Sequence, residues 1–128
     1  MVLCVSAIKV DDSHGNAVLE LTDGWYPASG VLDTCLTAHV KSKRIRIGDK
    51  LWIVGCRYAA EHNDAQHSAM KSLTITLHAN GTRKAHPRCK LGLHLLSPRT
   101  FVLPISTLRV DGGDVWCIDA VVQRVRAM

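Results

Sequence analysis

Apolar and polar residues alternate along much of the chain, a spacing that places every second side chain on the same face of a β-strand. At residues 72–79, for example, leucine and isoleucine alternate with serine and threonine, and we expect Leu73, Ile75 and Leu77 to point inward. This alternation, or a short apolar run, predicts strands at residues 2–10, 17–22, 25–32, 50–57, 72–79 and 115–126. The sequence therefore predicts a chain that is mostly β-sheet.

The connection between the second and third predicted strands has the composition of a tight hairpin. Asp23 and Gly24 lie between the two strands, and this pair readily adopts the positive φ angles that a type I′ turn requires at both central residues. Pro27 lacks a backbone N–H, so we expect the third strand at a sheet edge or at a bulge. Asp23 and Gly24 are accordingly interpreted as structural residues.

One segment interrupts the strands with a helical pattern. Residues 33–42 begin with Asp33 and Thr34, either of which can act as the N-cap, and Leu36 and Val40 form a short apolar stripe. Residues 59–69 are polar and rich in histidine, asparagine and aspartate. That composition is typical of a long connecting loop or a frayed helix.

Five strands with a short helix between the third and the fourth follow the order of an oligonucleotide/oligosaccharide-binding (OB) barrel, although other small β folds share parts of it. The length of 128 residues suits one domain. We therefore predict an all-β, five-stranded OB-fold barrel with one short helix, as a single domain over residues 1–128. Residues 1–80 are expected to form its core, and residues 81–128 an extension with an extra strand.

Composition permits certain partners without choosing one. The formal net charge is +5 and the isoelectric point is about 9.1, which permits nucleic acid or an acidic protein; a basic but inert surface is an equal alternative. The five cysteines have no paired spacing, which indicates a reducing compartment, the nucleus or the cytosol. No run is long and apolar enough to cross a membrane, so no membrane partner is expected.

No residue pattern predicts catalysis, a metal site or another cofactor. The aspartates lie mainly in turns, and no cysteine or histidine pair with zinc spacing has a second half-site. Asp119 differs, because it lies inside an apolar segment. We expect a buried carboxylate there to act as a structural hydrogen-bond hub rather than as an acid or base. The chain is therefore not expected to be an enzyme.

Basic residues gather in two segments and mark the expected binding surface. The first segment precedes the fourth strand, and the second follows the fifth strand, where the rim of a barrel can meet a phosphate or an acidic peptide. The candidates for binding nucleic acid or an acidic partner are Lys41, Lys43, Arg44, Arg46, Arg57, Arg83, Lys84 and Arg88. The alternative is a solvated surface, which most charge runs form.

Aromatic side chains are candidate stacking platforms for single-stranded nucleic acid. Trp25 and Tyr26 open the third predicted strand, and one of them is expected to face the core because neighbours alternate. We favour packing over stacking for this pair, since large aromatic side chains are mostly buried. Trp52 and Trp116 lie within apolar runs and are also interpreted as packing residues.

The chain contains, in this order, the strings ELTDGWYPASGVLD, RIGDKLWIVG, LHANGTRKA, KLGLHLL and DGGDVWCIDAVVQR. Their order and spacing resemble the first OB fold in the DNA-binding region of the breast cancer type 2 susceptibility protein family. The resemblance implies a nuclear role in homologous recombination and double-strand break repair. In that family a helical domain and three OB folds bind single-stranded DNA and a very small acidic protein. The first OB fold packs on the helical domain and holds part of the acidic protein.

The sequence departs from the family's pattern beyond this fold. The helical domain, the later OB folds and the recombinase-binding repeats are missing, and residues 59–69 match poorly. We therefore expect an excised domain that scaffolds the acidic partner and the neighbouring helical and OB domains. Alone it is expected to bind single-stranded DNA weakly and to self-associate through surfaces left uncovered. The alternative is a stand-alone single-stranded nucleic-acid-binding OB protein.

Overall fold

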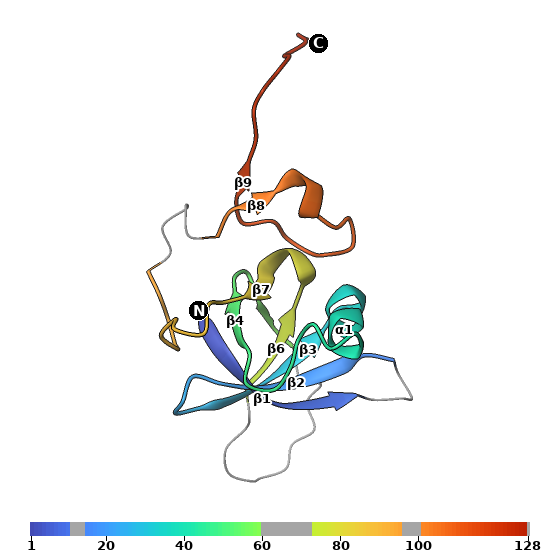
Figure 1. Ribbon diagram of the computed structural model, residues 1–128. Coiled ribbons are helices and arrows are strands. Elements are labelled where there is room, and N and C mark those ends of the chain that lie inside the picture. Colours follow the sequence, from blue (N-terminus) through green and yellow to red (C-terminus); the bar gives the residue numbers. More distant parts are fainter. Residues whose placement is uncertain (11–14, 60–72, 96–100, 128) are drawn as a thin grey trace.

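The computed structural model describes residues 1–10, 15–59, 73–95 and 101–127, and it shows a curled β-sheet with a helix at one side (Figure 1). Apart from Ala59, the connecting segment predicted at residues 59–69 lies outside the described residues. Short 3₁₀ turns occur at Ala79–Gly81 and Ile105–Thr107. In chain order the strands and the helix are β1 (Val2–Val10), β2 (Ala17–Thr22), β3 (Pro27–Leu32), α1 (Thr34–Lys41), β4 (Lys50–Ile53), β5 (Arg57–Tyr58), β6 (Leu73–Leu77), β7 (Thr82–Lys84), β8 (Leu103–Pro104) and β9 (Ile118–Asp119).

Seven of the strands form one sheet in the order β5-β6-β3-β2-β1-β4-β7. All neighbours are antiparallel except β3 and β6, which run parallel. The single strand predicted at residues 50–57 is divided in two, because Gly55 adopts a φ of 67° and bends the chain. Before the bend β4 pairs with β1, and after it β5 pairs with β6. The bent segment thus joins the two sides of the sheet, as a strand does in a barrel.

Alternate side chains of the strands fill the interior of the curl. Leu19 and Leu21 are buried on β2, and Ile75 and Leu77 are buried on β6, as the alternation predicts. Each such side chain, once removed from water, contributes roughly 1.5–3 kcal/mol to folding. Leu73 follows the same alternation but is 46% exposed, because it begins β6 at the rim of the sheet.

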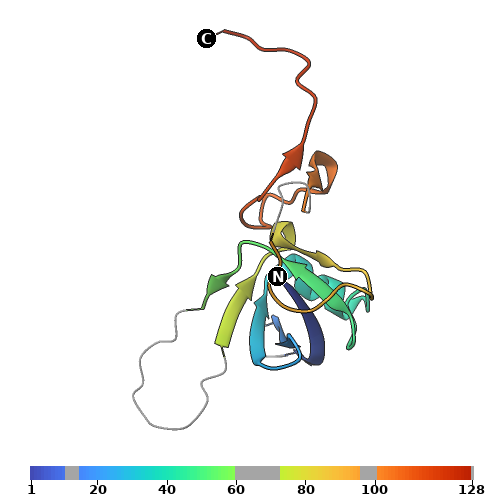
Figure 2. The ribbon, with the colours of Figure 1, turned by 90° about the vertical axis from the view of Figure 1, so that its left-hand side faces the viewer.

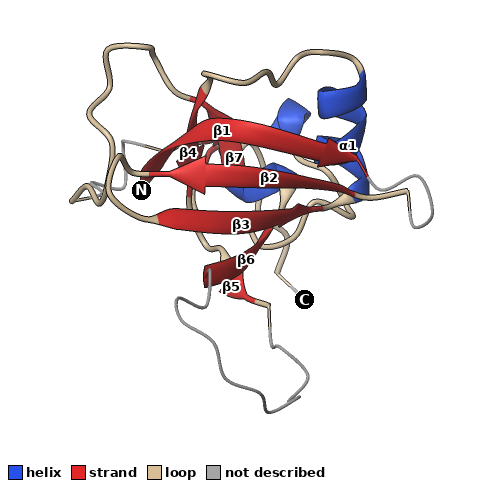
Figure 3. Ribbon diagram, turned by 90° about the horizontal axis from the view of Figure 1, so that it is seen from below, coloured by secondary structure: helices blue, strands red, loops and turns tan. Residues whose placement is uncertain are grey.

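Helix α1 lies at one end of the curled sheet (Figure 3), where Leu36 and Val40 join the buried cluster. Asp33 is its N-cap. Carboxylate Oδ1 of Asp33 accepts a hydrogen bond from the backbone N of Leu36 at 2.8 Å, and Oδ2 accepts one from the backbone N of Ala79 at 2.6 Å. One carboxylate therefore satisfies a donor of the first helical turn and ties the helix to the residues after β6.

Replacing Asp33 with alanine is expected to lower the free energy of unfolding by about 2–3 kcal/mol, because both hydrogen bonds are lost. Asp33→Asn keeps one acceptor oxygen and should lose only about 1 kcal/mol. Urea unfolding followed by circular dichroism measures both changes. An alanine variant as stable as the wild type would contradict this role for Asp33.

The segment after residue 100 packs outside the barrel, next to β7 (Figure 1). Phe101 is fully buried against Val54 and Leu103, with Trp52 partly buried beside them. This second, smaller cluster lies on β4 and the residue that follows it. Phe101 and Leu103 of the extension thus pack on the barrel, whereas many other large apolar residues of the extension are exposed.

The β2–β3 connection differs from the predicted turn. Asp23 does not adopt the positive φ that a type I′ turn requires, whereas Gly24 has a φ of 99°. Instead, Oδ1 of Asp23 accepts hydrogen bonds from the backbone N of Trp25 and of Tyr26, each at 2.8 Å. These bonds lower the pKa of the Asp23 carboxyl, that from Tyr26 most. The side chain of Asp23 thus shapes a wider loop than the predicted two-residue turn.

Pro27 does not place β3 at an edge. The strand lies inside the sheet, between β2 and β6. Pro27 is its first residue and pairs with Thr22 of β2, while pairing with β6 starts one residue later, at Ala28. A missing N–H at the first residue leaves the ladder intact, so the prediction of an edge or bulge was wrong.

The long final strand predicted at residues 115–126 is also wrong. Only Ile118–Asp119 forms a strand there, β9, which pairs with β8. The residues after β9 extend away from the barrel (Figures 1 and 2). A strand needs a neighbour for its N–H and C=O groups, and β8 offers two residues. Trp116 is consequently 55% exposed, and Asp119 is exposed rather than buried, so the structure supports neither the packing nor the hub interpretation.

Candidate partner-binding face

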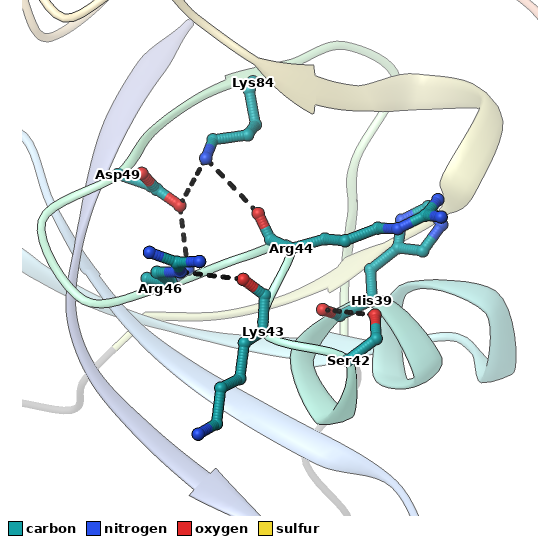
Figure 4. Close-up of polar contacts among 7 residues, drawn as sticks. All are labelled: His39, Ser42, Lys43, Arg44, Arg46, Asp49 and Lys84. Atoms are coloured by element: carbon teal, nitrogen blue, oxygen red, sulfur yellow. Dashed lines mark hydrogen bonds and ion pairs between the residues drawn. The ribbon is translucent and has the colours of Figure 1, made fainter.

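The two basic segments of the sequence meet on one face of the barrel (Figure 4). The ammonium Nζ of Lys84 lies 2.8 Å from Oδ2 of Asp49 and 3.3 Å from the carbonyl O of Arg44. This contact joins β7 to the loop after α1, although Lys84 and Arg44 are 40 positions apart in the chain. We name the cationic side chains gathered here the basic patch; its members are Lys43, Arg44, Arg46, Arg83 and Lys84.

Local hydrogen bonds fix the loop that carries the first half of the patch. The backbone N of Arg46 donates to Oδ2 of Asp49 at 2.8 Å, and Nε of Arg46 donates to the carbonyl O of Lys43 at 2.9 Å (Figure 4). Lys43 adopts a φ of 57°, the left-handed conformation that often follows a helix. These hydrogen bonds therefore fix the conformation of the loop that carries Lys43, Arg44 and Arg46.

The members of the patch differ in how firmly they are held. Lys84 is paired with Asp49, and the guanidinium of Arg83 lies 4.5 Å from the centre of the Phe101 ring and donates to the carbonyl O of Val102 at 3.2 Å. By contrast, the side chains of Lys43 and Arg44 make no hydrogen bond or ion pair with any described residue. The charge available to a partner thus comes first from Lys43 and Arg44.

Asp49 connects the two halves of the patch, because its carboxylate contacts both Lys84 and Arg46. Its burial would raise the pKa of its carboxyl, but hydrogen bonds from Lys84 and from the backbone of Arg46, together with their positive charges, outweigh burial and lower that pKa. The carboxylate therefore stays ionised, and it keeps the two halves of the patch together.

Stability is expected to fall as the pH drops below about 4, because the pKa of Asp49 is lower in the folded than in the unfolded chain. The stabilisation is present above the unfolded pKa and disappears as the pH falls through the folded pKa. Asp49→Asn should lower the free energy of unfolding by about 1 kcal/mol at neutral pH. The free energy of unfolding of the variant should also fall less steeply with decreasing pH below about 4. Urea unfolding at a series of pH values tests this; parallel curves for variant and wild type would contradict it.

The remaining basic candidates lie outside the patch. Arg57 on β5 pairs with Asp114, with Nη2 and Oδ2 2.6 Å apart. Nζ of Lys41 lies 3.5 Å from the carbonyl O of Gly15, and Arg88 is exposed in the segment after β7. The structure thus gathers five of the eight candidates and separates the other three.

Sequence reasoning missed Asn80 beside the patch. Its amide Nδ2 donates to the carbonyl O of Arg109 and of Gly113, and its Oδ1 accepts from the backbone N of Arg109, all at 2.9 Å. Asn80 is buried and thereby fastens the extension to the barrel. Its only signal in the sequence is the Asn80-Gly81 pair, which predicts a turn. That pair does not predict the contact with the distant loop that contains Arg109 and Gly113.

Three exposed aromatic residues, Trp25, Tyr26 and Tyr58, gather at the other end of the barrel. Trp25 is 89% exposed and Tyr26 72% exposed, because both lie in the β2–β3 loop and not in a strand, so the packing interpretation was wrong. Tyr26 and Tyr58 border a largely apolar cavity of about 530 Å³ that also reaches Leu73. We name this cavity and the loop beside it the open mouth. It lies near the N-terminus, away from α1 (Figure 3).

Other kinds of site find no support in the described part of the chain. No three histidine, cysteine, aspartate or glutamate side chains cluster there as a metal site. No helix among the described residues has the length and apolar character to span a bilayer. The basic patch and the open mouth therefore remain as the candidate binding surfaces.

Comparison with known proteins gives a consistent result. A family model described as "BRCA2, oligonucleotide/oligosaccharide-binding, domain 1" matches residues 1–95. "Protein BREAST CANCER SUSCEPTIBILITY 2 homolog A" and "homolog B" of Arabidopsis thaliana are each 32% identical over 129 aligned positions, which cover 90% of this chain and 11% of the plant protein. The chain thus spans a small part of these relatives. The matches confirm the predicted OB fold and the resemblance seen in the five strings.

Proposed function

Because the chain belongs to the BRCA2 family as its first OB domain, we propose that it is an interaction module that holds part of a small acidic protein on the basic patch. An OB domain of this kind is a binding module and not an enzyme. The parent protein would act in homologous recombination and double-strand break repair in the nucleus. That wider role is proposed from the family, since the chain spans 11% of the plant relatives.

The observation that carries the proposal is the uncompensated charge of Lys43 and Arg44. Neither side chain has a partner among the described residues, and Asp49, the carboxylate beside them, is already bonded to Lys84 and Arg46. Exposed cations on a rigid loop attract an acidic segment and set its register. The patch therefore suits a chain of carboxylates.

The separation of cations from aromatics supports only a weak contribution to single-stranded DNA binding by this domain alone. Binders of single-stranded nucleic acid place stacking aromatics along a basic groove. Here Trp25, Tyr26 and Tyr58 are exposed at the open mouth, whereas the basic patch lies by α1 and β7 (Figures 3 and 4). In this proposal, tight binding of single-stranded DNA needs the other domains of the parent protein.

We propose that a neighbouring domain of the parent protein packs against the open mouth. Its exposed Trp25, Tyr26, Tyr58 and Leu73 form an apolar surface of the kind that packs against another protein surface. Taken alone, the chain is expected to self-associate as its concentration rises, and Tyr58→Ser should weaken that association. Sedimentation velocity over a concentration series measures both; a strictly monomeric wild type would contradict the assignment.

Fluorescence anisotropy can separate the two candidate ligands. The small acidic partner and an oligothymidylate would each be labelled and titrated with the full chain at low and at physiological salt. We expect the acidic partner to bind and to weaken with salt, and the oligothymidylate to bind weakly even at low salt. The exposed aromatics favour one alternative, a stand-alone single-stranded nucleic-acid-binding protein. Tight oligothymidylate binding with no binding of the acidic partner would establish that alternative and overturn the proposal.

A further inference from the structure

The first residue of β7 carries a buried hydroxyl without a partner. Thr82 is 8% exposed, and its Oγ1 makes no hydrogen bond in the described part of the chain. Buried polar groups are nearly always bonded, and an exception needs an explanation such as a ligand that is not part of the chain. The neighbouring Arg83 and Lys84 belong to the basic patch, which makes an anion the natural candidate.

Two adjoining cavities are both lined by Thr82. One has a volume of about 650 Å³ and the other about 250 Å³. Four residues line both cavities: His39, Arg44, Thr82 and Arg83. Arg109 lines the larger one in addition. Guanidinium and hydroxyl groups are thus concentrated around one small space.

Guanidinium, imidazole and hydroxyl groups together are donors suited to an oxyanion, and arginine in particular forms paired hydrogen bonds with phosphate. We propose that Arg44, Thr82 and Arg83, with His39 beside them, bind one phosphate group on a phosphorylated serine or threonine of a protein partner. The proposal rests on the proposed function, because the phosphorylated residue would belong to an acidic segment held on the basic patch. Phosphorylation would then strengthen the docking.

The surroundings favour a phosphorylated protein over nucleic acid. A single-stranded nucleic acid would bring a base next to each phosphate, and bases bind by stacking on aromatic rings. Apart from the imidazole of His39, the residues that line the two cavities include no aromatic side chain. Phe101 is fully buried beneath Arg83. The site thus offers several donors to a phosphate, and the ring of His39 is its one aromatic surface for a base.

In this proposal a side chain has to move before a phosphate reaches the hydroxyl. Oγ1 of Thr82 is buried, so a phosphate can reach it only if a covering side chain moves. The side chain of Arg44 makes no hydrogen bond or ion pair with a described residue, and its movement therefore breaks no such bond. Arg44 is expected to swing over the phosphate as it binds.

Nuclear magnetic resonance on the full chain tests the site first with inorganic phosphate. Saturable shifts of the backbone amides of His39, Arg44 and Thr82 are expected, with sulfate as the competing ion. Thr82→Val keeps the shape of the side chain and should weaken phosphate binding about tenfold, the effect of losing a hydrogen bond to a charged group. Arg88→Gln removes a charge outside the patch and should leave binding unchanged. Shifts spread evenly over all basic residues would overturn the site.

Short peptides identify the carrier of the phosphate. An aspartate-rich peptide with a central phosphoserine should bind at least about tenfold more tightly than the same peptide with serine, and Thr82→Val should erase that difference. Equal binding of the two peptides would overturn the inference, as would an oligothymidylate that binds more tightly than the phosphopeptide and loses affinity in Thr82→Val. If the acidic partner binds wild type and Thr82→Val alike and phosphorylation has no effect, the proposed function stands and only this inference fails. The melting temperature of Thr82→Val confirms that the variant is folded.

Discussion

Gly81→Ala is expected to lower the free energy of unfolding by about 4 kcal/mol or more, a large part of the roughly 5–15 kcal/mol that stabilises a typical domain. A Cβ added at Gly81 would lie 2.3 Å from the carbonyl O of Val54. That close approach also brings the backbone N of Val54 within 2.8 Å of the carbonyl O of Gly81. Relief of the clash would have to separate the turn before β7 from the bend after β4. The barrel and the basic patch would be disturbed together.

Gly24→Ala serves as the matched control for this clash. A Cβ at Gly24 meets no atom within 4 Å, but Gly24 has a φ of 99°, so its replacement should cost only about 1–2 kcal/mol of backbone strain. Urea unfolding followed by tryptophan fluorescence compares the two variants. A Gly81→Ala variant as stable as Gly24→Ala would contradict the packing at Gly81.

Charge reversal at Lys43 and Arg44 should weaken binding of the acidic partner about a hundredfold, since each substitution replaces an attraction with a repulsion. These two residues suit the test because their side chains make no hydrogen bond or ion pair with a described residue. Reversal of Lys84 or Arg83 would instead remove the contact with Asp49 or with Phe101 and so confuse binding with folding.

The double variant Arg88→Glu with Lys90→Glu is the matched control, because it changes the net charge by the same amount on exposed residues outside the patch. Isothermal titration calorimetry with the small acidic partner gives the affinities. We expect the control to lose no more than about threefold, by long-range electrostatics alone. Equal losses in the two double variants would show that net charge, and not the patch, attracts the partner.

The sequence predicted the features that depend on neighbouring residues. Alternation located β1, β2 and β6, because the side of a strand on which a residue lies follows from local geometry. Asp33 was one of two expected N-caps, and its position before an apolar stripe is a local signal of the same kind. These elements form the core, so the fold class followed from them.

Features that depend on distant contacts were missed. The segment at residues 115–126 has the composition of a strand, but the structure gives it only a two-residue partner in β8. Trp25 and Tyr26 were placed in β3 because the side-chain bonds of Asp23, which widen the loop, leave no mark in the alternation.

The basic patch was predictable from the sequence only in part. Its two basic segments were visible in the sequence, but their meeting depends on the contact of Lys84 with Asp49, which only the fold creates. Thr82 carries no sequence signal at all, because its burial without a partner results from the packing of β7.

The central claim is that the basic patch, and not the open mouth, holds the acidic partner. Hydrogen–deuterium exchange of the full chain, with and without the small acidic partner, tests this claim most directly. We predict protection in peptides that cover residues 39–46 and 82–84, and none at residues 23–28 and 57–58. Protection confined to residues 23–28 and 57–58 would contradict the account and assign partner binding to the open mouth.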